Sequence, residues 1–181
     1  FTRSGSTWTQ QARLEASDLQ SNDIFGWDVE VNSDATYAII ASRSAGGGTG
    51  AAYIFTRSGS TWTEQTRLNP SIPNGYGAGQ TNSVSMNSDC STVVLGSSYH
   101  ASSISIYAGL AYIFIRSGST WTEQAVLEAP DGGDDDGFGW KVSMSSNGNY
   151  VAISAYGEDG GVGNPTSNSG AAYVFERDGS T

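Results

Sequence analysis

The sequence is poor in the residues on which many enzymes and disulfide-bonded domains depend. Cys90 is the only cysteine, so no intrachain disulfide can form. His100 is the only histidine, and the residues around it show no nucleophile motif. No apolar run approaches the roughly 20 residues that a transmembrane helix requires. We therefore expect a protein that is not an enzyme and does not insert into a membrane.

Positive charge is also scarce. Eight Lys and Arg residues stand against eighteen Asp and Glu residues, which gives a formal net charge of -10, and Lys141 is the only lysine. Binding to nucleic acid phosphates requires clustered positive charge, so we expect no nucleic acid partner. An acidic surface suits solubility, cation uptake or a saline exterior.

Glycine and aromatic residues are plentiful instead. The chain has 24 glycines, five tryptophans and nine tyrosines. Many glycines are typical of short strands joined by frequent turns, and the large aromatic side chains supply a core that disordered chains lack. The composition favours an all-β fold.

The sequence contains an internal repeat with a period of roughly 50 to 60 residues. FTRSGSTWT occurs at residues 1–9 and 55–63, FIRSGSTWT at 114–122, and a partial copy, FERDGST, at 175–181. Each later copy follows a GAAYIF-like segment. The copies at residues 1–9 and 114–122 are each followed, after a variable loop, by Phe-Gly-Trp. The repeat is therefore the structural unit of the protein.

Four strands, A to D, are expected in each repeat, and in the first one they span residues 26–31, 37–42, 50–57 and 61–68. The turns between strands A and B and between C and D contain the Asn, Asp, Gly and Ser residues that hairpins require. Strand B is apolar on both faces, so it must be covered on both sides. The pattern predicts an all-β fold of tandem four-stranded antiparallel blades of the β-propeller type, three per chain. A parallel β-helix is the alternative.

The repeats divide the chain as follows: residues 25–79 form repeat 1, 80–137 repeat 2, and 138–181 repeat 3, which lacks its strand D. Residues 1–24 hold half of a hairpin and a strand D that is expected to complete a neighbouring blade. Repeat 2 is the weakest copy, because Gln80 and Thr81 replace Phe-Gly.

Three blades are too few for a closed propeller, which has about four to eight. An unpaired strand edge invites another chain, so we expect head-to-tail self-association into a ring or a filament. The alternative is that these residues are a window of a longer array. The expected interface residues lie in the first strand D and the last strand C: Thr7, Trp8, Thr9, Ala12, Leu14, Tyr173 and Phe175.

The recurring Phe25-Gly26, GAAYIF and RSGSTWTEQ motifs resemble FG-GAP repeats, the blades found in the head of integrin α-chains. This resemblance implies an extracellular or cell-surface location and a role in binding, adhesion or scaffolding. Calcium-binding members of that family carry D-x-D-x-D-G loops between strands A and B. The corresponding turns here, at residues 32–35, 87–90 and 145–148, are too short and too poor in carboxylates, so that metal site is not transferred.

Other residues are candidates for ligand binding. Four carboxylates in a glycine-rich loop have the oxygen ligands that Ca²⁺ prefers, or else form a solvated acidic loop: Asp131, Asp134, Asp135 and Asp136. Trp27 and Trp140 follow Phe-Gly and either stack on a carbohydrate or pack in the core. Cys90 aligns with a turn in which its side chain is expected to be exposed.

Together, the sequence predicts a non-catalytic extracellular structural or adhesive repeat protein that needs no cofactor and assembles through its strand edges. The alternative is a ligand-binding β-propeller that takes a glycan or a protein partner, with or without calcium.

Overall fold

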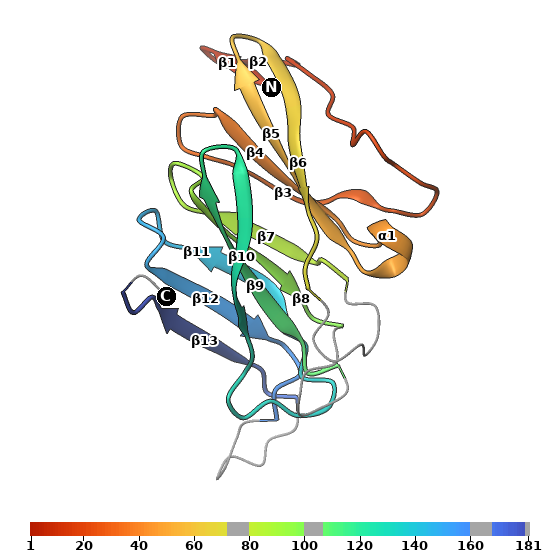
Figure 1. The fold of residues 1–181 in the computed structure, drawn as a ribbon, viewed down its shortest axis with the longest axis vertical. Coiled ribbons are helices and arrows are strands. Elements are labelled where there is room, and N and C mark those ends of the chain that lie inside the picture. The colour runs from red at the N-terminus through yellow and green to blue at the C-terminus, as the bar shows by residue number, and fades with distance from the viewer. Residues whose placement is uncertain (72–79, 100–106, 160–167, 180–181) are drawn as a thin grey trace.

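The computed structural model describes residues 1–71, 80–99, 107–159 and 168–179, and within them the chain is almost entirely β. The only helix among these described residues is a single short turn, α1 (Ala45–Gly48). Three sheets follow one another along the chain, as Figure 1 shows by the passage from orange through green to blue. His100 lies outside the described residues.

Each sheet is an antiparallel meander in which the strands keep their sequence order. Sheet 1 has the order β3-β4-β5-β6: β3 (Phe25–Val31), β4 (Tyr37–Ser42), β5 (Ala51–Ser58) and β6 (Thr61–Leu68). Sheet 2 has four strands in the equivalent order: β7 (Ser83–Met86), β8 (Thr92–Ser97), β9 (Leu110–Ser117) and β10 (Thr120–Leu127). Sheet 3 has three strands: β11 (Phe138–Met144), β12 (Tyr150–Ala155) and β13 (Ala171–Glu176). The predicted fold class, tandem antiparallel blades, is confirmed.

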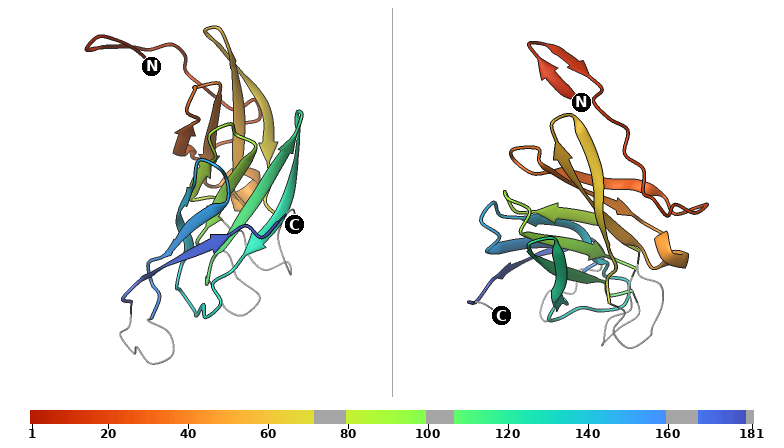
Figure 2. Two further views of the ribbon diagram at one scale, coloured as in Figure 1. Left: turned by 90° about the vertical axis from the view of Figure 1, so that its left-hand side faces the viewer. Right: turned by 45° about the horizontal axis from the view of Figure 1, so that its top comes forward.

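The first residues form a separate hairpin of β1 (Thr2–Ser4) and β2 (Thr7–Thr9), which is a two-stranded sheet of its own. Figure 2 shows this hairpin beyond the edge of sheet 1, joined to it by an extended segment. β2 ends at Thr9, and residues 10–24 pair with no other described strand of this chain.

The core lies between the sheets, because alternate residues of a strand point to opposite faces. In β8, Val93 packs toward sheet 1 and the adjacent Val94 packs toward sheet 3, and both are fully buried. This explains why strand B lacks the usual alternation of apolar and polar residues. In β12, by contrast, Tyr150 and Ala152 are exposed, because no further sheet covers that face among the described residues.

The turns between strands A and B also pack against one another across the sheets. Asn32 donates a side-chain hydrogen bond to the carbonyl of Ser88 (3.2 Å), and Ser88 donates its backbone N–H to the carbonyl of Ser146 (3.0 Å). Cys90 lies in the middle turn with a φ of 52° and is fully buried. The expectation that its side chain is exposed was wrong. A turn of an isolated hairpin would be exposed, but the Cys90 side chain packs in the apolar core between sheets 1 and 2.

Burial should make Cys90 inert. Desolvation raises the pKa of its thiol to about 12, so almost no thiolate is present near neutral pH. We expect no reaction of the folded protein with a thiol reagent at pH 8, and full reaction after denaturation in urea. Rapid labelling of the native protein, followed by mass spectrometry, would contradict the buried position.

Candidate assembly interface

Sheet 3 ends in β13, its strand C, whereas sheets 1 and 2 each continue with a strand D. β13 pairs with β12 along its full length, from Ala171 opposite Ala155 to Glu176 opposite Tyr150. Its other side carries no strand among the described residues. In sheets 1 and 2, β6 and β10 occupy the corresponding place beside β5 and β9. The edge of β13 is therefore the place for a fourth strand.

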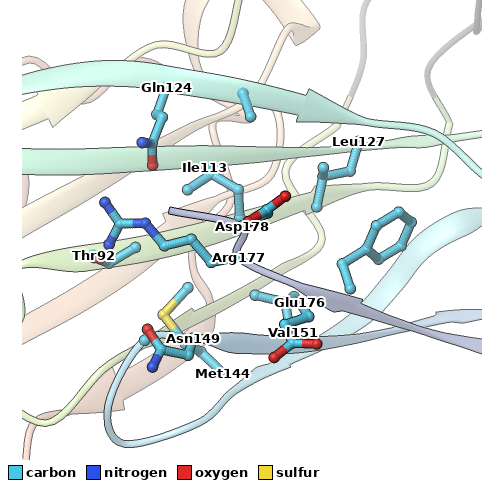
Figure 3. A pocket seen from close by; sticks show the side chains of 13 residues that line it. Thr92, Ile113, Gln124, Leu127, Met144, Asn149, Val151, Glu176, Arg177 and Asp178 are labelled. Atoms are coloured by element: carbon cyan, nitrogen blue, oxygen red, sulfur yellow. The ribbon is translucent and has the colours of Figure 1, made fainter. Parts of the chain in front are cut away.

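A hollow of about 190 Å³ lies beside this edge, and we call it the edge hollow (Figure 3). Apolar side chains of sheets 2 and 3 form much of its lining, and polar side chains complete it. The residues used below are Ile113, Gln124, Leu127, Val151, Phe175 and Arg177. Gln124 belongs to β10, and Arg177 directly follows β13.

The corresponding position in sheet 2 is filled by a tryptophan. Trp121 on β10 is half-buried and packs against the core between sheets 1 and 2. Its indole Nε1 donates a hydrogen bond to Oε1 of Gln65 on β6 of the preceding sheet (3.2 Å). The guanidinium of Arg116, from the same hairpin, lies 5.9 Å from the centre of its ring.

The arrangement recurs in sheet 1, where Trp62 donates to Gln11 (3.0 Å) and the guanidinium of Arg57 lies 5.9 Å from the ring centre. In the repeat alignment, Gln124 is the counterpart of Gln11, and Arg177 is the counterpart of Arg57. The edge hollow thus has the glutamine and the arginine of this arrangement. No tryptophan lies in this hollow among the described residues.

The segment that carries Gln11 is held as a strand D would be. The backbone N–H and Oγ of Ser17 donate to the carboxylate of Glu64 on β6 (2.8 and 3.0 Å). Ser71 makes the same pair of bonds to Glu123 on β10 (2.8 and 2.6 Å). Residues 10–17 therefore lie against sheet 1 as residues 64–71 lie against sheet 2, and Trp8 at their start is 64% exposed.

A charged contact near the end of strand D also differs between the sheets. In sheet 1, Asp18 accepts a hydrogen bond from the Tyr53 hydroxyl (2.8 Å) and pairs with Arg67 on β6 (2.6 Å). The hydrogen bond from Tyr53 is the main cause that lowers the pKa of Asp18. This contact joins strand C, strand D and the loop before strand A.

Sheet 3 has the tyrosine and the acid of this contact without the arginine. The Tyr173 hydroxyl lies 2.7 Å from Oδ1 of Asp131 and 3.0 Å from Oε2 of Glu158. Burial raises the pKa of Glu158, which is 3% exposed. The counterpart of Arg67 in the first strand D is Arg13, whose side chain is exposed and pairs with Glu15 (2.6 Å).

The predicted interface residues fall into two groups that one chain does not bring together. Thr7, Trp8 and Thr9 form β2 at the top of Figure 1, while β13 lies at the lower left. Ala12 is exposed, and Leu14 is half-buried beside the outer face of sheet 1.

Tyr173 and Phe175 on β13 point toward the core of sheet 3. Both contact Phe138 edge to face, with ring centres 5.5 and 6.0 Å apart. The residue of β13 between them, Val174, is 69% exposed. Sequence analysis missed Val174, Gln124 and Arg177, although the repeat alignment holds the signal for the last two.

The acidic loop does not gather its four carboxylates. Asp136 is buried and accepts a hydrogen bond from the backbone N–H of Gly133, while Asp131 contacts Tyr173. Asp134 and Asp135 are exposed. In the part of the chain that the structure describes, no three His, Cys, Asp or Glu side chains are grouped to hold a metal ion. Calcium binding by this loop stays a prediction.

The fold defines the class of protein as a tandem array of four-stranded antiparallel blades of the β-propeller type. The family model for the FG-GAP repeat matches residues 8–55 and 121–175, and the chain belongs to this family. Its members are typically extracellular. None of the described helices is of the length and hydrophobicity that crossing a bilayer demands.

No curated protein sequence matches this chain. Among solved structures, TolB from Acinetobacter baumannii aligns with 90% of this chain at 16% identity and a TM-score of 0.48. The aligned part is 32% of the TolB chain.

Proposed function

We propose that this protein is a non-catalytic, extracellular structural or adhesive repeat protein whose chains join head to tail. The segment that begins at Trp8 in one chain acts as strand D for sheet 3 of another chain. The edge hollow carries this proposal, because it contains Gln124 and Arg177. These are the counterparts of the glutamine and the arginine that contact the strand D tryptophan in sheets 1 and 2. Membership in the FG-GAP family supports the extracellular location.

The strand register of sheet 1 indicates how two chains would join. Tyr53 lies opposite Arg67, and Ile54 lies opposite Thr66. The same register would set Arg13 of one chain opposite Tyr173 of the next. Arg13 would then reach Asp131 as Arg67 reaches Asp18.

The same docking would bring Trp8 to the edge hollow. Its indole N–H would donate to Gln124, and its ring would lie beside Arg177 and above Ile113 and Val151. Burying an exposed tryptophan removes a large apolar surface from water, which favours association. A contact of this kind joins unlike surfaces, so repeated contacts close into a ring or continue as a filament.

A proline at Val174 tests this proposal. The backbone N–H of Arg177 points to β12, where it donates to the carbonyl of Asn149 (2.8 Å). Because the direction alternates along a strand, the N–H of Val174 points to the open edge. Val174→Pro would remove a donor from that edge without breaking a β12–β13 bond.

We expect the unaltered chain to associate with increasing concentration in sedimentation velocity, and Val174→Pro to stay monomeric with an unchanged circular dichroism spectrum. Val174→Thr keeps both the N–H and the branched side chain, so this control should associate like the unaltered chain. An unaltered chain that is monomeric at all concentrations would contradict the proposal. So would a proline variant that assembles normally.

A further inference from the structure

A second hollow lies where strands A of the three sheets begin, away from the edge of β13. We call it the strand A hollow, and its volume is about 190 Å³. Trp27 on β3, Trp140 and Lys141 on β11, and Asn82 directly before β7 line it. Each of the three sheets therefore contributes to this hollow.

The two tryptophans of the strand A hollow are exposed, unlike the packed Trp62 and Trp121. Trp27 is 44% exposed and Trp140 is 37% exposed. The guanidinium of Arg43 lies 4.4 Å from the ring centre of Trp27, and Tyr156 contacts Trp140 edge to face at 5.1 Å. These neighbours fix the two rings and leave part of each one open to a ligand.

Asn82 gives the hollow a polar group without a partner. The residue is 2% exposed, its backbone N–H donates to the carbonyl of Gly96 (2.8 Å), and its Nδ2 donates to Oγ of Ser98. Its Oδ1 is buried and accepts no hydrogen bond within the described residues. An unsatisfied buried acceptor is unfavourable, so a ligand that donates a hydrogen bond there gains affinity.

One charged residue of the lining, Lys141, adds further hydrogen-bonding capacity. Nζ of Lys141 lies 3.2 Å from Oδ2 of Asp28, and this ammonium is exposed. Aromatic faces together with a few placed donors and acceptors are typical of small-ligand sites, although this hollow is smaller than a drug-sized pocket of about 300 Å³ or more.

We propose that the strand A hollow binds a saccharide, with one sugar ring against the indoles of Trp27 and Trp140 and a hydroxyl donating to Oδ1 of Asn82. A sugar ring has an apolar C–H face for the indole and hydroxyls for the amide. The hollow has room for one ring of a longer glycan. This site is separate from the assembly interface, so it does not depend on the function proposed above.

The test uses the 181-residue chain on an array of neutral and uronic acid oligosaccharides, followed by tryptophan fluorescence titration with the glycans that bind. We expect binding, and a loss of affinity of about tenfold or more in both Trp27→Ala and Trp140→Ala. Both rings are exposed, so the variants should remain folded. Val31→Ala, an exposed residue on the same strand as Trp27, is the matched control and should bind normally.

Three outcomes would overturn the assignment. The first is that no glycan on the array binds. The second is that both tryptophan variants keep full affinity. The third is that the hollow binds peptides from a displayed library and no glycan, which would indicate a protein partner. Titration of Val174→Pro separates this site from assembly, because it should bind the glycan while remaining monomeric.

Discussion

Replacing Trp8 with alanine should weaken the association between chains by about 30-fold or more, while the folding stability of each chain stays unchanged. Trp8 is 64% exposed in the free chain, so its loss removes almost no packing there. In the proposed contact it fills the edge hollow, where a buried tryptophan is typically worth about 2 kcal/mol or more. That free energy corresponds to about 30-fold in the dissociation constant, which sedimentation equilibrium can measure.

A double-mutant cycle with Gln124 shows whether Trp8 enters this hollow. Gln124→Ala alone should weaken association, because the indole N–H loses its acceptor. In the Trp8→Ala background the same change should have almost no further effect. Additive losses would mean that Trp8 and Gln124 act at different places. Tyr107→Ala, an exposed aromatic residue in the loop before β9 of sheet 2, should leave association unchanged.

The strands were predictable from the sequence because several signals agree in every repeat. Turn residues bound each strand, and the observed β4 and β6 have the predicted limits of 37–42 and 61–68. β3 and β5 begin or end one residue from the prediction. A repeat also tests each assignment three times, so an error in one copy is visible in the others.

The environment of single residues was less predictable, because it depends on how sheets pack. Cys90 is in a turn, and it is buried because its side chain packs in the core between sheets 1 and 2. Tyr173 and Phe175 alternate with Val174, but the period of a strand does not say which face is covered. Gln124 and Arg177 are recognised as candidate interface residues only because Gln65 and Arg116, their counterparts, contact Trp121.

Two glycines in equivalent positions should respond very differently to alanine. Gly26 and Gly139 are the glycines of the Phe-Gly pairs, with φ angles of 87° and 88°. A Cβ on Gly26 would meet nothing within 4 Å, whereas a Cβ on Gly139 would lie 2.3 Å from the carbonyl oxygen of Leu110 in sheet 2. Positive φ alone costs about 1 to 2 kcal/mol for alanine. Forcing packed backbones apart adds about 1 to 3 kcal/mol or more.

We therefore expect Gly26→Ala to lower the free energy of unfolding by about 1 to 2 kcal/mol, and Gly139→Ala by about 2 to 5 kcal/mol. Urea denaturation of both variants at low protein concentration measures the difference. Because the two backbones share the same φ, the difference reports the contact between sheets 2 and 3. Equal losses would show that these backbones do not touch as described.

The same pair of variants connects stability to assembly. Leu110, which faces Gly139, has Ala171 as its counterpart in sheet 3. If sheet 3 of one chain packs on the open face of sheet 1 of the next, the partner's Ala171 carbonyl would face Gly26 at the same close distance. Gly26→Ala would then leave the free chain folded, with only the small loss of stability given above, and prevent joining. Sedimentation velocity would record this as a monomer at concentrations where the unaltered chain assembles. Normal assembly of this variant would mean that the open face of sheet 1 takes no such partner.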